Sequence, residues 1–122
     1  MKYMLMLCDA EGSVYWTMPK AEREKADARI GQWWGDKQHQ GVIEGGAQLQ
    51  GPEKATTVRT RNGKPVITDG PFIEAKESIG GYAIVNVNDL DAALGLAREW
   101  VTLFPRDGSI VEVRPLVERE GA

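Results

Sequence analysis

The stretch GGYAIVNVNDLDAALGLAREWVTLF, residues 80–104, changes its apolar period from two to about 3.6 near its middle. Its first part, Gly80 to Val87, alternates between two faces and is typical of a strand. After Asn88, a predicted helix cap, the apolar residues return at helical spacing: Ala93, Leu96, Ala97, Trp100 and Phe104. The stretch therefore predicts a strand followed directly by an amphipathic helix.

A similar unit precedes it. Tyr3 to Cys8 is a continuous apolar run that predicts a strand. Thr17 and Pro19 then indicate the start of a helix, whose apolar stripe is Ala26, Ile30, Trp33 and Trp34. Further strands are expected from Val42 to Leu49 and from Ser109 to Leu116. The order is βαββαβ, which predicts a ferredoxin-like α+β fold with two helices on one face of an antiparallel sheet.

A β-hairpin is predicted between the two units. Asn62-Gly63 separates the β-branched runs Thr56 to Arg61 and Lys64 to Thr68. Asn-Gly supplies the two positive-φ residues that a type I′ turn requires. We interpret the hairpin as an insertion in a single domain over residues 1–118, followed by a polar tail at 119–122.

Composition narrows the range of partners. The 122 residues carry a net charge of -3, which gives no general attraction to nucleic acid or to an anionic membrane. Cys8 is the only cysteine and His39 the only histidine, so neither a disulfide nor a recognisable zinc site is expected. We expect a cytoplasmic protein without a metal or other cofactor.

The strands indicate that the sheet is covered on both faces. The first strand is apolar at nearly every position, and Tyr82 and Ile84 lie opposite the helix-facing side of theirs. Two helices cover only one face, so the second cover is either another subunit or the tail or hairpin of the same chain. We favour a homodimer formed through the open face of the sheet.

Charged residues on the last strand form one candidate site. Glu112 and Arg114 share the face that the dimer would cover, about 7 Å apart along the strand. They are either a structural ion pair or groups that bind a ligand, since charges on such a face need a partner. Tyr82 would either place its hydroxyl in the same cleft or fill the core.

The segment Asp69-Gly70-Pro71-Phe72 is the second candidate. The Asp69 carboxylate either stabilises the turn or acts as a catalytic base beside a glycine that permits close approach. Lys76 and Glu77 follow as substrate-binding candidates or as exposed charges. The site hypothesis therefore joins a catalytic Asp69 to a binding group that consists of Lys76, Glu77, Tyr82, Glu112 and Arg114.

Several segments together resemble the YCII-related proteins, and more narrowly the branch named for its DGPF motif. They occur in the family order from Met1 to about Leu116: Met1–Leu5, Ala55–Arg59, Thr68–Phe72 with Glu74, Lys76-Glu77, Gly80–Tyr82 and Val111–Pro115. The resemblance implies a dimeric α+β barrel and a pocket between the sheet and nearby loops. Because of this pocket, the resemblance implies an enzyme. From Asp69 as a base and Arg114 as a group that orients the ligand, we expect binding of a small organic molecule with acid–base chemistry of an isomerase or lyase type.

The resemblance also carries one departure and one alternative. The shorter YciI-like branch has a histidine in its first helix that is proposed to work with an aspartate, whereas the corresponding stretch here, Arg23 to Ala26, has none. Genes of the DGPF branch often neighbour or fuse to those of sigma factors. The alternative expectation is therefore a regulatory or ligand-sensing module whose partner is a sigma factor.

Overall fold

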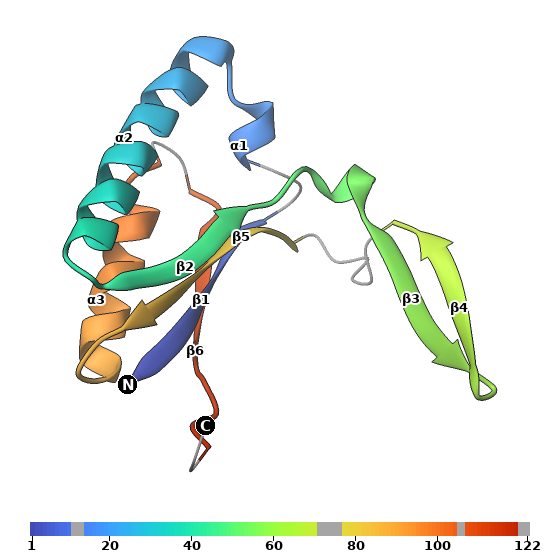
Figure 1. The fold of residues 1–122 in the computed structure, drawn as a ribbon. Coiled ribbons are helices and arrows are strands. Elements are labelled where there is room, and N and C mark those ends of the chain that lie inside the picture. Colours follow the sequence, from blue (N-terminus) through green and yellow to red (C-terminus); the bar gives the residue numbers. More distant parts are fainter. Residues whose placement is uncertain (11–13, 71–76, 105–106, 120–122) are drawn as a thin grey trace.

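Four antiparallel strands form the central sheet of the computed structural model, which describes residues 1–10, 14–70, 77–104 and 107–119. The order across the sheet is β2-β5-β1-β6 (Figure 1). The strands are β1 Lys2–Ala10, β2 Ile43–Gln48, β5 Glu77–Asn86 and β6 Ser109–Pro115. The two central strands are neighbours although the sequence separates them widely, as the split βαβ arrangement of an α+β fold requires.

Two long helices, α2 (Lys20–His39) and α3 (Leu90–Val101), cover one face of this sheet (Figure 1). The α3 stripe is confirmed, since Ala93, Leu96, Ala97 and Trp100 are buried. The predicted cap at Asn88 is wrong by one residue. Asp89 has an extended backbone, and its carboxylate accepts a hydrogen bond of 2.9 Å from the Ala92 N–H.

A short helix that the sequence did not predict, α1 (Val14–Thr17), precedes α2. Pro19 then occupies the N-cap position of α2, which has no side-chain hydrogen bond as a cap. Proline fixes φ near the helical value and stops α1 from running into α2. The chain therefore turns at this point, and α1 lies against β1.

The core lies between the helices and the sheet. Leu5 of β1 and Val85 of β5 are its largest fully buried side chains. Trp33 of α2 packs edge-on against Trp100 of α3, with ring centroids 5.5 Å apart. The Trp33 indole N–H also donates to the Glu99 carboxylate at 3.2 Å. These contacts join the two helices to each other above the sheet.

The other face of the sheet is apolar at its centre and charged at its margins. Cross-strand register places Met4 beside Ile84 and Met6 beside Tyr82, and none of these side chains belongs to the helix-facing core. Lys2 and Glu44 form an ion pair of 3.0 Å, and the Lys2 hydrogen bond lowers the pKa of the Glu44 carboxyl. We call this surface the open face.

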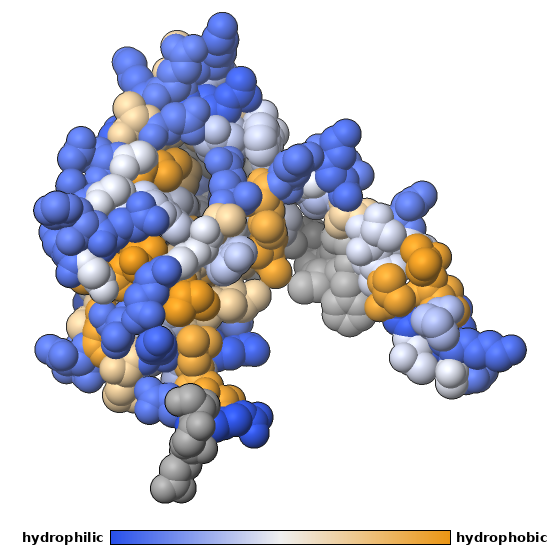
Figure 2. Space-filling view, viewed as in Figure 1, coloured by the Kyte–Doolittle hydropathy of each residue, from blue (hydrophilic) through white to orange (hydrophobic). Residues whose placement is uncertain are grey.

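A separate two-stranded sheet projects away from the rest (Figure 1). Its strands are β3 (Thr56–Arg61) and β4 (Lys64–Asp69), joined through Asn62 and Gly63, which both have positive φ. A single 3₁₀ turn, η1 (Pro52–Lys54), leads into β3. Apolar side chains gather on this hairpin (Figure 2), where Val58 lies directly opposite Ile67 and both are exposed.

Membrane-spanning helices are absent from the part of the chain that the structure describes, because none combines the required length with sufficient apolar character.

Candidate functional site

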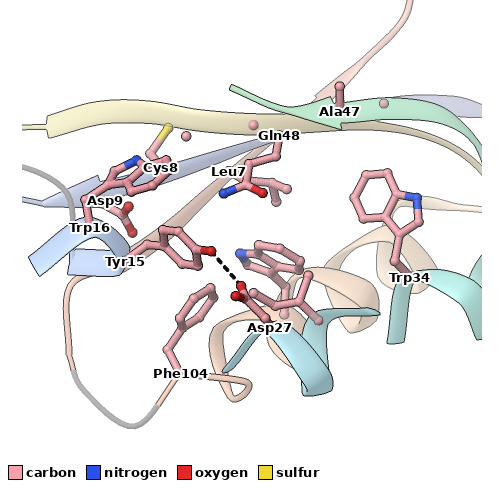
Figure 3. Close-up of a pocket in the computed structure, with 15 residues that line it drawn as sticks. Leu7, Cys8, Asp9, Tyr15, Trp16, Asp27, Trp34, Ala47, Gln48 and Phe104 are labelled. Carbon is pink, nitrogen blue, oxygen red and sulfur yellow. Dashed lines mark hydrogen bonds between the residues drawn. The ribbon is translucent and has the colours of Figure 1, made fainter. Parts of the chain in front are cut away.

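A cavity of about 260 Å³ lies between the sheet and the helices, on the side opposite the open face. We call it the sheet–helix pocket. Figure 3 shows strands on one side and the side chains of α1 and α2 facing them. Its fifteen lining residues come from every layer of the main domain: β1, β2 and β5 from the sheet, both long helices, α1, and Phe104 just after α3.

Glycines make room for the pocket at the sheet. The pairing of β1 with β5 shifts register between Leu7 and Cys8, opposite Gly80 and Gly81. A Cβ at Gly81 would lie 2.8 Å from the Ala47 carbonyl oxygen, so a larger residue does not fit without a shift. This bulge therefore leaves bare backbone beside the cavity, where a ligand can approach closely.

Asp9 is the buried charged group of the pocket. It follows Tyr3, Leu5 and Leu7 at every second position of β1, so the same alternation that builds the core also turns Asp9 toward the helices. Its exposed fraction is 9%, and Asp9 is the one buried polar or charged residue of the described chain. A buried carboxylate is costly to desolvate, which marks the position for a specific interaction.

Tyr15 and Asp27 form a second polar group in the wall of the pocket. The Tyr15 hydroxyl donates to the Asp27 carboxylate at 2.6 Å, which ties α1 to α2 (Figure 3). Burial disfavours the phenolate and raises the pKa of Tyr15 above its ordinary value of 10.0, and the hydrogen bond to Asp27 raises it further. Tyr15 therefore stays a hydrogen-bond donor at neutral pH.

The raised pKa of Tyr15 predicts a specific loss of stability in alkali. As the pH rises, the unfolded chain loses the Tyr15 hydroxyl proton at a lower pH than the folded chain does. The stabilising contribution of Tyr15 is therefore complete below about pH 10 and is lost as the pH rises through the higher folded-state pKa. Tyr15→Phe should reduce the fall in the free energy of unfolding between about pH 9 and about pH 11, measured by urea denaturation. Parallel decreases in the two proteins would contradict the assignment.

The residues singled out from the sequence lie elsewhere. Glu112 and Arg114 form an ion pair of 3.1 Å on the open face, and Tyr82 lies on that face opposite Met6. Asp69 is exposed at the end of β4 in the hairpin sheet, opposite Thr56. Within this chain they are distributed over two separate sheets, and none of the four lines the sheet–helix pocket.

Less can be said of the other two predicted site residues, Lys76 and Glu77. Lys76, like Pro71 and Phe72 of the DGPF segment, lies outside the described residues, and Glu77 is described only as the first residue of β5. Gly70, which is described, is held to the base of the hairpin because the Thr57 hydroxyl donates to its carbonyl oxygen at 2.6 Å. The roles assigned to Asp69 and its partners remain predictions.

Sequence reasoning missed the residues of the pocket. The alternation of side chains along β1 places Asp9 on the same side as Leu5 and Leu7, so the sequence alone could have indicated that Asp9 faces the helices. Trp33 is in the core as predicted, but its neighbour Trp34 lines the pocket. Tyr15 and Asp27 meet only because α1 folds back against α2, and no local pattern indicates that contact.

The pocket offers acceptors, a donor and apolar rings. Asp9 and Asp27 can accept hydrogen bonds or protons, and the Tyr15 hydroxyl and the Gln48 amide add further polar groups. No group of three or more His, Cys, Asp or Glu side chains suited to a metal ion occurs among the described residues. The chemistry that these side chains can supply themselves is hydrogen bonding, proton transfer and aromatic contact.

Comparison with known proteins gives a family. The chain matches the model of the YCII-related domain over residues 1–118. It is 40% identical over 70 residues to an uncharacterized protein of Rhizobium meliloti (strain 1021), and the match covers 57% of this chain and 56% of the relative. The chain thus spans only a little more than half the length of that relative. Because the family model covers nearly all of its residues, the chain belongs to the YCII-related domain family.

Proposed function

We propose that the protein binds a small organic molecule in the sheet–helix pocket. The observation that carries this proposal is the cavity of about 260 Å³ at which Asp9, Tyr15 and Asp27 meet aromatic side chains. A dry cavity of about 150 Å³ already accepts a benzene molecule, so the space suits a ligand somewhat larger than one aromatic ring. Binding sites typically combine such apolar walls with a few placed polar groups.

The reaction class that these groups suit is acid–base chemistry. A carboxylate, Asp9 or Asp27, would accept a proton from the bound molecule, and the Tyr15 hydroxyl would donate one. Isomerisation and lyase-type elimination both consist of such proton transfers. Support for this part comes from the residue types and their arrangement around one cavity.

Blocking the pocket tests the binding proposal. Ile30→Trp should fill the cavity from α2, whereas Ala28→Trp places the same side chain on the exposed face of that helix. In ligand-observed NMR with a chemically diverse fragment library, we expect hits on the wild type and on Ala28→Trp that Ile30→Trp loses. Equal hits on both variants, or none on the wild type, would refute the proposal, provided thermal melting shows that both variants are folded.

We also propose that two copies pair through the open face to form the dimeric barrel, with the hairpin as an addition to each ferredoxin-like unit. The support is the composition of this face. Met4, Met6, Tyr82 and Ile84 provide an apolar centre, and ion pairs lie toward the edges of the sheet. An apolar centre with a polar rim is the usual anatomy of a protein interface. Glu112 and Arg114 would then lie at the interface.

A charge placed on the open face tests the dimer. Ile84→Lys should convert a particle of two 13.5 kDa chains into a single chain, because a lysine ammonium is costly to bury against apolar residues. Ala92→Lys, on the exposed side of α3, should leave the dimer intact. Light scattering after size-exclusion chromatography measures the mass. A wild-type protein that elutes as one chain would contradict the proposal.

A further inference from the structure

Both charged residues in the described lining of the sheet–helix pocket are acidic. Asp9 and Asp27 are among its lining residues, and no lysine, arginine or histidine is among those that the structure describes. The two carboxylates come from opposite layers, Asp9 from the sheet and Asp27 from α2 (Figure 3). A ligand between them therefore meets a carboxyl group from each layer.

Aromatic rings supply the rest of the wall. Five of the fifteen lining residues are aromatic: Tyr15, Trp16, Trp34, Trp100 and Phe104. The face of such a ring carries negative electrostatic potential and attracts an organic cation, most strongly in tryptophan and in a desolvated site. Tyr15 and Trp16 already stand edge to face, with centroids 4.9 Å apart. Aromatic rings and carboxylates therefore favour the same sign of charge.

The low polarity of the pocket wall strengthens this preference. In the interior, a charge interacts more strongly with another charge than it does in water, because the surroundings are less polarisable. A cation in the pocket would therefore gain more from the Asp27 carboxylate than it would in water, and an anion would be repelled more strongly. Tyr15 also points its hydroxyl at Asp27, which holds that carboxylate in place at the wall.

We propose that the pocket selects a small organic cation, an amine or quaternary ammonium compound with an aromatic or compact apolar body, over neutral and anionic molecules of the same shape. This inference rests on the binding proposal above and adds the chemical class of the ligand. The apolar body would pack among the tryptophans, and the positive head group would lie toward Asp9 and Asp27.

Matched probes separate this inference from the binding proposal. Benzylamine, benzyl alcohol and benzoate share one ring and carry a positive, neutral and negative head group at neutral pH. Three of the four tryptophans line the pocket, so quenching of intrinsic fluorescence reports binding. We expect benzylamine to bind about tenfold more tightly than benzyl alcohol, and benzoate to bind most weakly.

Two variants complete the test. Asp27→Asn should reduce the preference for benzylamine over benzyl alcohol severalfold, whereas Asp36→Asn, on the same helix but outside the pocket, should retain it. Equal or stronger binding of the neutral or anionic probe to the wild type would overturn the cation preference while the binding proposal stands. A preference that Asp27→Asn leaves unchanged overturns the role given to that carboxylate. If none of the three probes binds and the fragment library also gives no hits, both proposals fail.

Discussion

Replacement of Trp100 by alanine should lower the free energy of unfolding by about 3–5 kcal/mol, the range found when large aromatic side chains are removed from a core. The indole is 8% exposed. Its ring lies 5.5 Å from Trp33 of α2 and 5.5 Å from Phe104, both edge-on. Removal therefore leaves a cavity and breaks two aromatic contacts, one of which joins α3 to α2.

Urea denaturation followed by far-UV circular dichroism measures this loss, because the transition follows the helix content of the whole chain. Trp16→Ala is the matched control, since Trp16 is 45% exposed on the short helix α1. We expect the control to lose about 1 kcal/mol or less. Equal losses in the two variants would mean that Trp100 does not hold the helices together.

The second large effect concerns one glycine of β2. Gly46 has φ of 139°, a conformation that other residues rarely adopt. A Cβ at this position would overlap the Tyr82 carbonyl oxygen and lie 2.9 Å from both the Ala83 Cα and the Trp34 ring. Gly46→Ala should therefore destabilise the protein by about 2–4 kcal/mol, through backbone strain and overpacking together.

Gly45 provides the control for this prediction, because it is the preceding residue of the same strand. A Cβ there meets nothing within 4 Å, and Gly45 does not have a positive φ. Gly45→Ala should therefore change the free energy of unfolding by less than about 1 kcal/mol in urea denaturation. Similar values for the two variants would show that neither the contact with Trp34 nor the backbone conformation constrains position 46.

Much of the fold is predictable because the spacing of apolar residues, every second residue in a strand and about every 3.6 in a helix, indicates which side chains are buried. In β6, Val111 and Val113 pack against the core, and Glu112 and Arg114 lie on the other face, as parity predicts. The strands on either side of Asn62-Gly63 also follow from local turn chemistry. Each of these features depends on residues that are near neighbours in the sequence.

The pocket is harder to predict because it depends on contacts between distant segments. It requires the bulge at Gly80-Gly81, the turn of α1 at Pro19 and the contact of Tyr15 with Asp27. Trp34 shows the difficulty most clearly. Helical phase places it beside Trp33 on the sheet side of α2, but its ring reaches the bare backbone at Gly46, a contact with a distant strand that helical phase does not predict.

A crystal structure of the protein soaked with benzylamine tests the central claim most directly. We expect electron density for the ligand inside the sheet–helix pocket, among Trp34, Trp100 and Asp27, with its ammonium group toward a carboxylate. Density beside Glu112 and Arg114 on the open face, with the pocket empty, would contradict binding in the sheet–helix pocket. Such density would instead support the functional site that the sequence indicated at Glu112 and Arg114.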